Sequence, residues 1–204
     1  MVDDAGALTR FLESSDVIDW HDPDVVAQAR ALRGDQTDPA VIARRCFEWV
    51  RDEIKHSADY GLKAVTCSAS DVLRERSGYC YAKSHLLAAL LRANGLPAGL
   101  CYQRLSLDGG GPPYCLHGLN AVWLPDVGWY RIDPRGNRAD ISAQFVPPVE
   151  QLAFSLSAPG EADLPEIWAE PLPVVVKALR AHVTTDSLSQ HLPDVVELLT
   201  GSSR

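Results

Sequence analysis

The sequence lacks the features that mark membrane, secreted and nucleic-acid-binding proteins. No stretch approaches the roughly 20 apolar residues that cross a bilayer, and the N-terminus has neither the basic start nor the apolar run of a signal peptide. The net charge is -8 at pH 7, and the Lys and Arg residues are scattered rather than gathered in a basic stripe. We therefore expect a cytoplasmic protein that binds neither a membrane nor a nucleic acid.

Internal repeats and low-complexity tracts are absent as well. The 204 residues are 46% hydrophobic and 23% charged, a composition typical of a folded domain and too apolar for a disordered chain. We expect one catalytic core over residues 37–146. An acidic N-terminal extension (residues 1–36) would precede it, and a proline-rich, helical C-terminal segment (residues 147–204) would pack on it.

The cysteines do not suggest a disulfide framework. Their number is odd, and the chain has no export signal, so reduced thiols are expected and one of them is available for chemistry. The five are Cys46, Cys67, Cys80, Cys101 and Cys115.

The order of the predicted elements is helices first and strands second. Capping residues and apolar spacing predict helices over residues 23–33, 39–56, 71–76 and 80–94, the last closed by Asn94 and Gly95. Strands are predicted over residues 98–107, 116–124 and 128–132, with a glycine- and proline-rich loop at 108–113. Two amphipathic stretches, residues 174–182 and 186–199, are interpreted as packing helices. This order, without regular strand and helix alternation, indicates an α+β fold.

Cys80 is the first candidate functional residue. It is predicted at the first turn of a helix, where unpaired N–H groups and the positive end of the helix dipole stabilise a thiolate. Gly78 would permit a sharp turn that exposes it, and a backbone N–H at the same helix end could receive an oxyanion. The competing interpretation is that Cys80 is a small buried apolar residue.

His117 and Asp133 stand at the two ends of a predicted hairpin. Its arms, joined by a turn at residues 125–128, are nearly equal in length, so antiparallel pairing should place the two side chains beside each other. Adjacent-strand partners are about 5 Å apart, so Asp133 could bond one ring nitrogen and leave the other for a thiol. Cys-His-Asp catalysis requires this arrangement.

Two segments resemble the transglutaminase-like superfamily. RSGYCYAKSHLLAALLRANGLPAG, residues 76–99, is similar to the helix that carries the nucleophile in this family, and HGLNAVWLPDVGWYRIDP, residues 117–134, is similar to its histidine and aspartate hairpin. The resemblance covers roughly residues 41–133. It implies a papain-like fold in which N-terminal helices, one bearing Cys80, pack on an antiparallel sheet bearing His117 and Asp133.

The resemblance also implies acyl transfer. The Cys80 thiolate would attack an amide carbonyl of a protein or peptide, His117 would protonate the leaving amine, and water or an amine would resolve the thioester. No metal and no organic cofactor is expected. The absence of extra β domains and of an acidic calcium loop favours hydrolysis over cross-linking. The second oxyanion donor, the substrate-binding residues and the oligomeric state stay open; the donor candidates are Trp49, Tyr102, Gln103 and Tyr114.

Three other functions compete with this interpretation. The chain could be a catalytically silent module that uses the fold for protein binding, although all three side chains of the triad are present. It could be a redox protein that pairs Cys80 with Cys101 or Cys115. Cys80, Cys101, Cys115 and His117 could also form a zinc site, but their spacing lacks paired CxxC motifs.

Four further polar residues receive structural interpretations. His85 is predicted to be a structural or pocket-edge histidine, and His56 to cap a helix C-terminus. Asn120 is interpreted as a buried hydrogen-bonding residue and Arg135 as half of a surface ion pair. The loop at 109–113 is either a mobile rim of a cleft or an inert connection.

Overall fold

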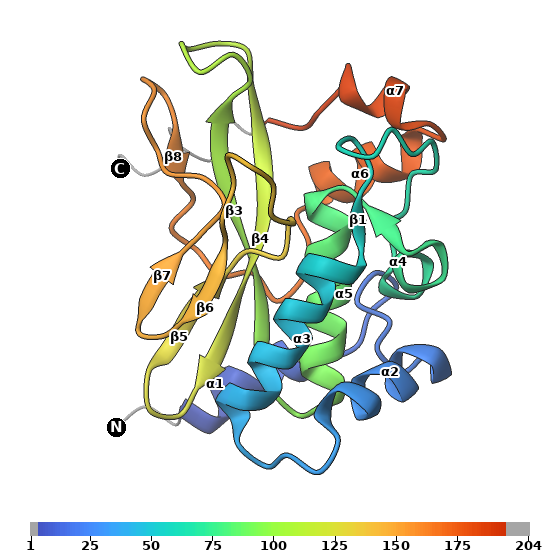
Figure 1. Ribbon diagram of the computed structural model, residues 1–204, viewed down its shortest axis with the longest axis vertical. Coiled ribbons are helices and arrows are strands. Elements are labelled where there is room, and N and C mark those ends of the chain that lie inside the picture. Colours follow the sequence, from blue (N-terminus) through green and yellow to red (C-terminus); the bar gives the residue numbers. More distant parts are fainter. Residues whose placement is uncertain (1–3, 195–204) are drawn as a thin grey trace.

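A computed structural model describes residues 4–194, and it confirms the α+β fold class with helices packed on an antiparallel sheet (Figure 1). The helical elements are α1 (Asp4–Thr9), η1 (Arg10–Leu12), α2 (Pro23–Arg33), α3 (Pro39–Glu53), α4 (Ala69–Glu75), α5 (Cys80–Ala93), α6 (Pro173–Ala181) and α7 (Thr185–Ser189). The strands are β1 (Lys55–His56), β2 (Ser77–Gly78), β3 (Ala98–Ser106), β4 (Tyr114–Leu124), β5 (Gly128–Ile132), β6 (Gln144–Val146), β7 (Val149–Gln151) and β8 (Ala162–Asp163).

The main sheet runs in the order β5-β4-β3-β8, with all its neighbours antiparallel. Two small pairs, the parallel β1-β2 and the antiparallel β6-β7, stand apart from it. Within residues 4–194, no helix is both long and apolar enough to cross a membrane.

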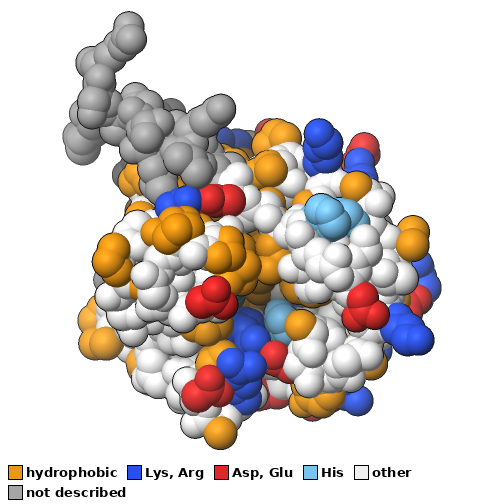
Figure 2. All heavy atoms as spheres, turned by 90° about the horizontal axis from the view of Figure 1, so that it is seen from above, with side chains coloured by type: hydrophobic (Ala, Val, Ile, Leu, Met, Phe, Trp, Pro, Cys, Tyr) orange, Lys and Arg blue, Asp and Glu red, His pale blue; other side chains and the backbone are white. Residues whose placement is uncertain are grey.

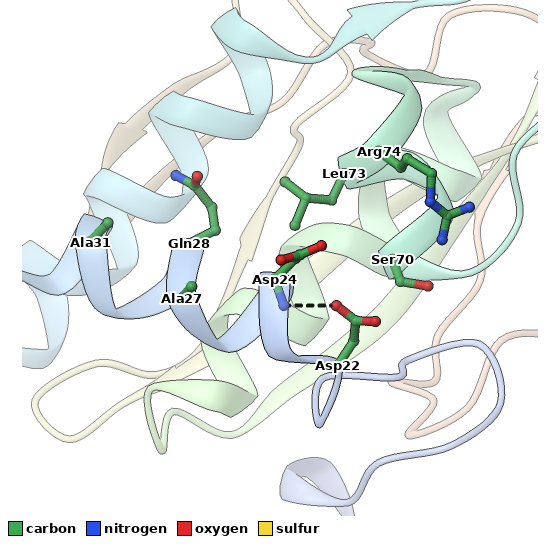
Figure 3. A pocket seen from close by; sticks show the side chains of 8 residues that line it. All are labelled: Asp22, Asp24, Ala27, Gln28, Ala31, Ser70, Leu73 and Arg74. Atoms are coloured by element: carbon green, nitrogen blue, oxygen red, sulfur yellow. Dashed lines mark hydrogen bonds between the residues drawn. The ribbon is translucent and has the colours of Figure 1, made fainter.

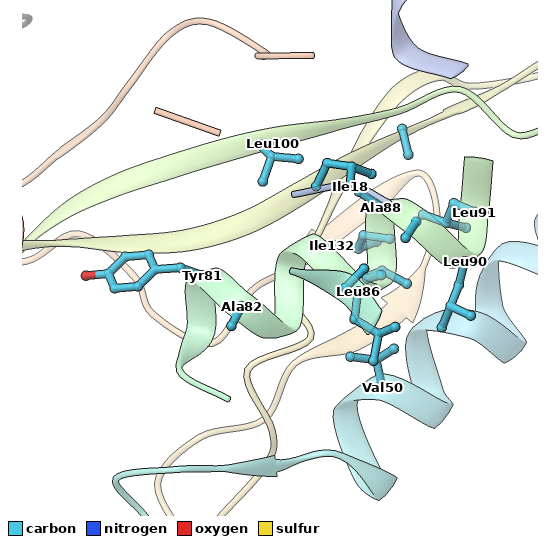
Figure 4. Close-up of a cluster of buried hydrophobic side chains, with 14 of the residues drawn as sticks. Ile18, Val50, Tyr81, Ala82, Leu86, Ala88, Leu90, Leu91, Leu100 and Ile132 are labelled. Carbon is cyan, nitrogen blue, oxygen red and sulfur yellow. The ribbon is translucent and has the colours of Figure 1, made fainter. Parts of the chain in front are cut away.

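Helix α5 is the centre of the hydrophobic core. The sequence predicts one apolar face on it, yet every residue from Cys80 to Arg92 is buried. The reason is its position, because α5 packs against β3 and β4 on one side and against α2, α3 and α4 on the other. Figure 4 shows the result: Leu86, Leu90 and Leu91 of α5 lie among side chains from β3, β5 and α3.

Local signals place several helix ends correctly. Helix α2 covers the predicted residues 23–33 and ends at Gly34, whose φ of 54° suits glycine. Asp38 caps α3 by accepting the backbone N–H groups of Ala40 and Val41, and Pro39 is the first helical residue. Ser68 caps α4, so this helix begins two residues earlier than predicted.

Helix α3 is shorter than predicted. It ends at Glu53, and the next residues form β1, in which His56 pairs with Gly78 of β2. The prediction that His56 caps a helix C-terminus is therefore wrong. The two-residue strand forms because the chain returns from α4 beside it, a contact between distant segments that no local signal announces.

The C-terminal segment is only partly helical. Helix α6 covers most of the predicted stretch at 174–182, but the prediction for 186–199 is wrong from Gln190 to Asp194, where the chain is not helical. Pro193 is incompatible with a continuing helix, and its carbonyl accepts the Leu116 N–H at 2.7 Å. Residues 195–199 lie outside the described residues. Strand β8 was not predicted; it extends the main sheet by pairing with β3.

Candidate active site

Cys80 is the first residue of α5, as predicted. Its N-cap residue, Tyr79, provides no side-chain cap, and the Gly118 N–H donates to the Cys80 sulfur at 3.5 Å. The turn before it is tightly packed, because a Cβ on Gly78 would lie 3.0 Å from the Ala82 and Thr66 side chains. The thiol therefore lies at the end of α5 where backbone N–H groups have no helical partner.

His117 and Asp133 are in contact. Nε2 of His117 lies 2.7 Å from Oδ2 of Asp133, and both side chains are buried. Asp133 is also fixed by two backbone donors, the N–H of Arg135 to Oδ1 and the N–H of Ala153 to Oδ2, each at 3.1 Å. The ring of Phe154 packs edge-on against the imidazole with centroids 4.9 Å apart. These contacts fix the orientation of the histidine ring.

The register that joins them differs from the prediction. The β4-β5 pairing ends at Asn120 opposite Ile132, so His117 and Asp133 are not cross-strand partners. Asp133 is the first residue after β5, and it reaches the imidazole from beyond the end of the ladder. His117 itself lies inside β4, opposite Gln103 of β3, rather than at the start of a strand.

The electrostatics couple His117 to both neighbours. Burial alone would lower the pKa of His117, but the charge of Asp133, the charge of Cys80 and hydrogen bonds with both raise it to about 10. Burial alone would raise the pKa of Asp133, but the charge and hydrogen bond of His117 hold it below its usual value. The arrangement therefore favours the protonated form of His117 beside Asp133.

Cys80 and His117 open onto a cleft of about 520 Å³. Its walls include Leu105 and Cys115 from the sheet and His56 and Tyr79 from the helical side. Figure 2 looks into this side of the molecule: a hollow lies between the two layers, with hydrophobic side chains around one part of it and histidine and basic side chains in and beside another.

The other cysteines are placed differently from one another. Cys115 lines the same cleft as Cys80, whereas Cys101 packs with Leu119 and Ala121 in a separate apolar cluster. Among residues 4–194, no group of three or more His, Cys, Asp or Glu side chains is placed to hold a metal ion. The zinc alternative, which needs Cys101 together with Cys80, is therefore wrong.

Two residues that the sequence interpretation did not place in the cleft belong to it. His56 and Arg135 each retain only 7% of their exposure and line it. Arg135 forms two hydrogen bonds with Asp59, at 2.7 and 2.9 Å, and its guanidinium lies 5.6 Å from the Phe154 ring centre. Arg135 thus forms an ion pair as predicted, but its surface location was wrong, since the residues after β5 turn inward and the Arg135 N–H binds the Asp133 carboxylate.

His85 and Asn120 have the structural roles predicted for them. The Nδ1 of His85 lies 2.8 Å from the carbonyl oxygen of Cys67. The amide of Asn120 donates to the carbonyls of Ser84 and Gly99, at 2.9 and 3.3 Å, and so ties α5 to the sheet. Neither side chain lines the cleft.

The four candidates for the second oxyanion donor do not line the cleft either. Each has a partner elsewhere: Trp49 stacks with Arg76, Tyr102 accepts the Leu172 N–H, Gln103 donates to Asp163, and Tyr114 donates to the Pro159 carbonyl. These positions favour none of the four candidates.

Lys83 is a buried charge that the sequence interpretation missed. It follows Cys80 by three residues on α5, has no exposed surface, and donates to the backbone carbonyls of Ile54 and Arg51. Burial and, next, the charge of Arg135 lower its pKa to about 7. The sequence feature that could have indicated its burial is a lysine among the small and apolar residues of CYAKSHLLAALLRA.

Lys83 should leave a signature in the pH dependence of stability. Between pH 7 and 10.5 the unfolded chain binds the lysine proton and the folded chain does not, so the stability of the wild type should rise with pH relative to Lys83→Met, by up to about 1.4 kcal/mol per pH unit. Urea unfolding of both proteins across this range measures the difference. Lys177→Met, at an exposed site, is the control and should match the wild type. A constant difference between wild type and Lys83→Met would contradict the assignment.

A second hollow, between α2 and α4, has no comparable chemistry (Figure 3). The Asp22 carboxylate in it accepts the Asp24 N–H at 2.9 Å and is the cap of α2. The hydroxyl of Ser70 is bonded to Asp19 at 2.5 Å. Neither cysteine nor histidine lines this hollow, so the cleft at Cys80 is the candidate active site.

The family model of the transglutaminase-like superfamily matches residues 26–134, more than half of the chain. This range contains Cys80, His117 and Asp133. It begins inside the segment that we interpreted as an N-terminal extension, and the predicted boundaries at residues 36 and 146 stay a prediction. A comparison with curated proteins finds no match.

Solved structures share the fold. The chain is similar to a candidate cysteine protease from Cytophaga hutchinsonii, with a TM-score of 0.52 and 21% identity over 64% of this chain and 42% of that one. It is also similar to the periplasmic domain of TgpA from Pseudomonas aeruginosa, with a TM-score of 0.50 and 24% identity over 65% of this chain and 48% of that one. The chain thus spans less than half of the length of either protein.

Proposed function

The chain belongs to the transglutaminase-like superfamily, and from that premise we propose that it transfers or hydrolyses acyl groups through a thioester on Cys80. Membership supports a cysteine-based activity in general. The observation that carries the specific proposal is the 2.7 Å contact of His117 with Asp133, on a ring that also bonds Cys80 at the start of α5. This arrangement gives the thiol a base and gives the base a fixed orientation.

The reaction follows from these positions. The Cys80 thiolate adds to an amide carbonyl, and the resulting oxyanion lies near the N–H groups at the start of α5. When the C–N bond breaks, the amine leaves with a proton from His117 and the acyl group stays on Cys80 as a thioester. Water then loses a proton to His117 as it attacks the thioester, which releases the acid and restores the thiolate. An amine that attacks instead forms a new amide.

We propose a protein or peptide amide as the substrate and hydrolysis as the favoured outcome. The cleft holds about 520 Å³, and apolar side chains such as Leu105 and Leu116 line it beside the nucleophile. The chemistry needs a reduced thiol, in keeping with the cytoplasmic location predicted from the sequence.

Iodoacetamide labelling at neutral pH tests the proposal without a known substrate. We expect one dominant alkylated residue, Cys80. Burial raises the pKa of each of the other thiols and keeps them protonated; the pKa values of Cys46, Cys101 and Cys115 rise to about 12, and that of Cys67 rises as well. Cys80→Ala should lose the label, and His117→Ala should slow it by roughly 10-fold or more, because the imidazolium no longer stabilises the thiolate. Peptide mass spectrometry identifies the site and the rate.

Cys101→Ala is the matched control, since this buried cysteine lies outside the cleft, and it should label like the wild type. Equal labelling of several cysteines, with no effect of His117→Ala, would contradict the triad and favour a silent binding module. Trapping of a Cys80–Cys115 disulfide, rather than of a thioester on Cys80, would instead favour the redox alternative.

A further inference from the structure

His56 lies beside the residues that lead into the nucleophile. It pairs with Gly78 across the parallel β1-β2 ladder, and the Ser57 N–H donates to the Gly78 carbonyl at 3.1 Å. Its ring centre is 5.4 Å from that of Tyr79, the residue before Cys80. The short ladder therefore fixes the His56 ring on the wall of the cleft next to the start of α5.

The fold does not use the His56 ring for a hydrogen bond at Nδ1. This atom is buried and has no hydrogen-bond partner among the described residues. Its nearest acidic neighbour, Asp59, is 3.7 Å away, beyond hydrogen-bond distance, and both Asp59 oxygens already accept from Arg135. Since no acceptor in the described part of the chain lies within hydrogen-bond distance of Nδ1, the single proton of the neutral ring is free to lie on Nε2.

Most other donors on the cleft walls are already committed. The hydroxyls of Tyr79, Tyr81 and Ser106 donate to backbone carbonyls, and the Arg135 guanidinium is paired with Asp59. Glu161 can only accept when ionised, and it binds backbone N–H groups. His56 is thus a cleft residue near Cys80 whose N–H is free to face a substrate.

We propose that His56 is the second donor to the oxyanion, acting with the backbone N–H of Cys80, an inference that rests on the proposed acyl transfer. The ring donates from Nε2, the nitrogen opposite the sealed Nδ1 edge, to the oxygen that becomes negative when the thiolate adds to the carbonyl. No proton is transferred in this contact.

The charge state of the ring suits this role. Burial and, next, the charge of Arg135 lower the pKa of His56 to about 3, so the ring is neutral at physiological pH. The groups that face it are Asp59, Arg135, Lys83 and His117, and Arg135 lowers the pKa of the ring more than Asp59 raises it. A neutral imidazole has one N–H to donate and does not compete with His117 for protons.

Two reagents separate this role from nucleophile activation. Acylation by p-nitrophenyl acetate passes through a tetrahedral oxyanion, whereas alkylation by iodoacetamide does not. His56→Ala should slow acylation of Cys80 by about 10²–10³-fold and leave alkylation nearly unchanged. His56→Gln, which retains a side-chain N–H, should recover part of the acylation rate, and His191→Ala, at an exposed histidine, should alter neither. Release of p-nitrophenolate and mass spectrometry measure the two rates.

The outcomes separate the two proposals. Equal loss of acylation and alkylation in His56→Ala would overturn the donor role, because it would mean that His56 only supports the position of Cys80. An unchanged acylation rate in a folded variant, as judged by its thermal melt, would overturn it as well. A wild type whose Cys80 is not acylated at all would overturn the acyl-transfer proposal together with the inference.

Discussion

Asp133→Asn is expected to lower the rate of Cys80 acylation by about 10⁴-fold while the chain stays folded. The carboxylate holds the proton of His117 on Nε2 and leaves Nδ1 for the thiol. An asparagine amide that donates to Nε2 would place the single proton of the neutral imidazole on Nδ1. The loss of the carboxylate charge would also let the pKa of His117 fall from about 10. Ester acylation kinetics measure the first effect, and imidazole NMR titration measures the second.

The hairpin offers a matched control for this substitution. Asp126 lies exposed in the turn of the same β4-β5 hairpin, so Asp126→Asn should acylate at the wild-type rate. Asp133→Asn should stay folded, since asparagine keeps one oxygen for a backbone N–H. Its thermal melt checks this. Acylation of Asp133→Asn at the wild-type rate, with the titration of His117 unmoved, would contradict the assignment of Asp133 as the residue that orients His117.

The sequence predicts those parts of the site whose position depends on neighbouring residues in the chain. The position of Cys80 follows from a turn glycine and a helix start, both of which are decided by neighbouring residues. The contact between His117 and Asp133 was predicted, but from a register that the structure does not have. The prediction succeeded because Asp133 leaves the sheet after Ile132 and turns back to the ring, a path fixed by the N–H groups of Arg135 and Ala153.

Residues whose environment depends on distant segments were misinterpreted. His56 looked like a helix cap because the end of α3 was placed three residues too late, and its burial depends on β2, more than twenty residues further along. Arg135 looked like a surface residue because Asp59, its partner, comes from another loop. Strands of two or three residues, such as β7 and β8, are too short to show the alternation that predicts a strand.

Arg92 connects the two flanks of the chain to the region that carries the family match. It lies near the end of α5, is 2% exposed, and donates twice to the Ala98 carbonyl at 3.1 and 2.8 Å. It also donates to the carbonyls of Glu13 and Ala169, which lie outside residues 26–134 on either side. One guanidinium thus satisfies backbone acceptors from the N-terminal segment, the start of β3 and the C-terminal segment.

Arg92→Met is therefore expected to destabilise the fold by about 3–5 kcal/mol, because several backbone carbonyls would lose a charged donor while the side-chain volume is nearly kept. Urea unfolding measures the change, and hydrogen exchange should rise near Glu13 and Ala169 before it rises in α5. Arg74→Met is the control, since this exposed arginine pairs with Asp71 at the surface, and it should change stability by less than about 0.5 kcal/mol. If both variants unfold at the same urea concentration, Arg92 does not hold the N- and C-terminal segments to the core. Apolar contacts, such as those of Ile18 and Val175, must then bind them.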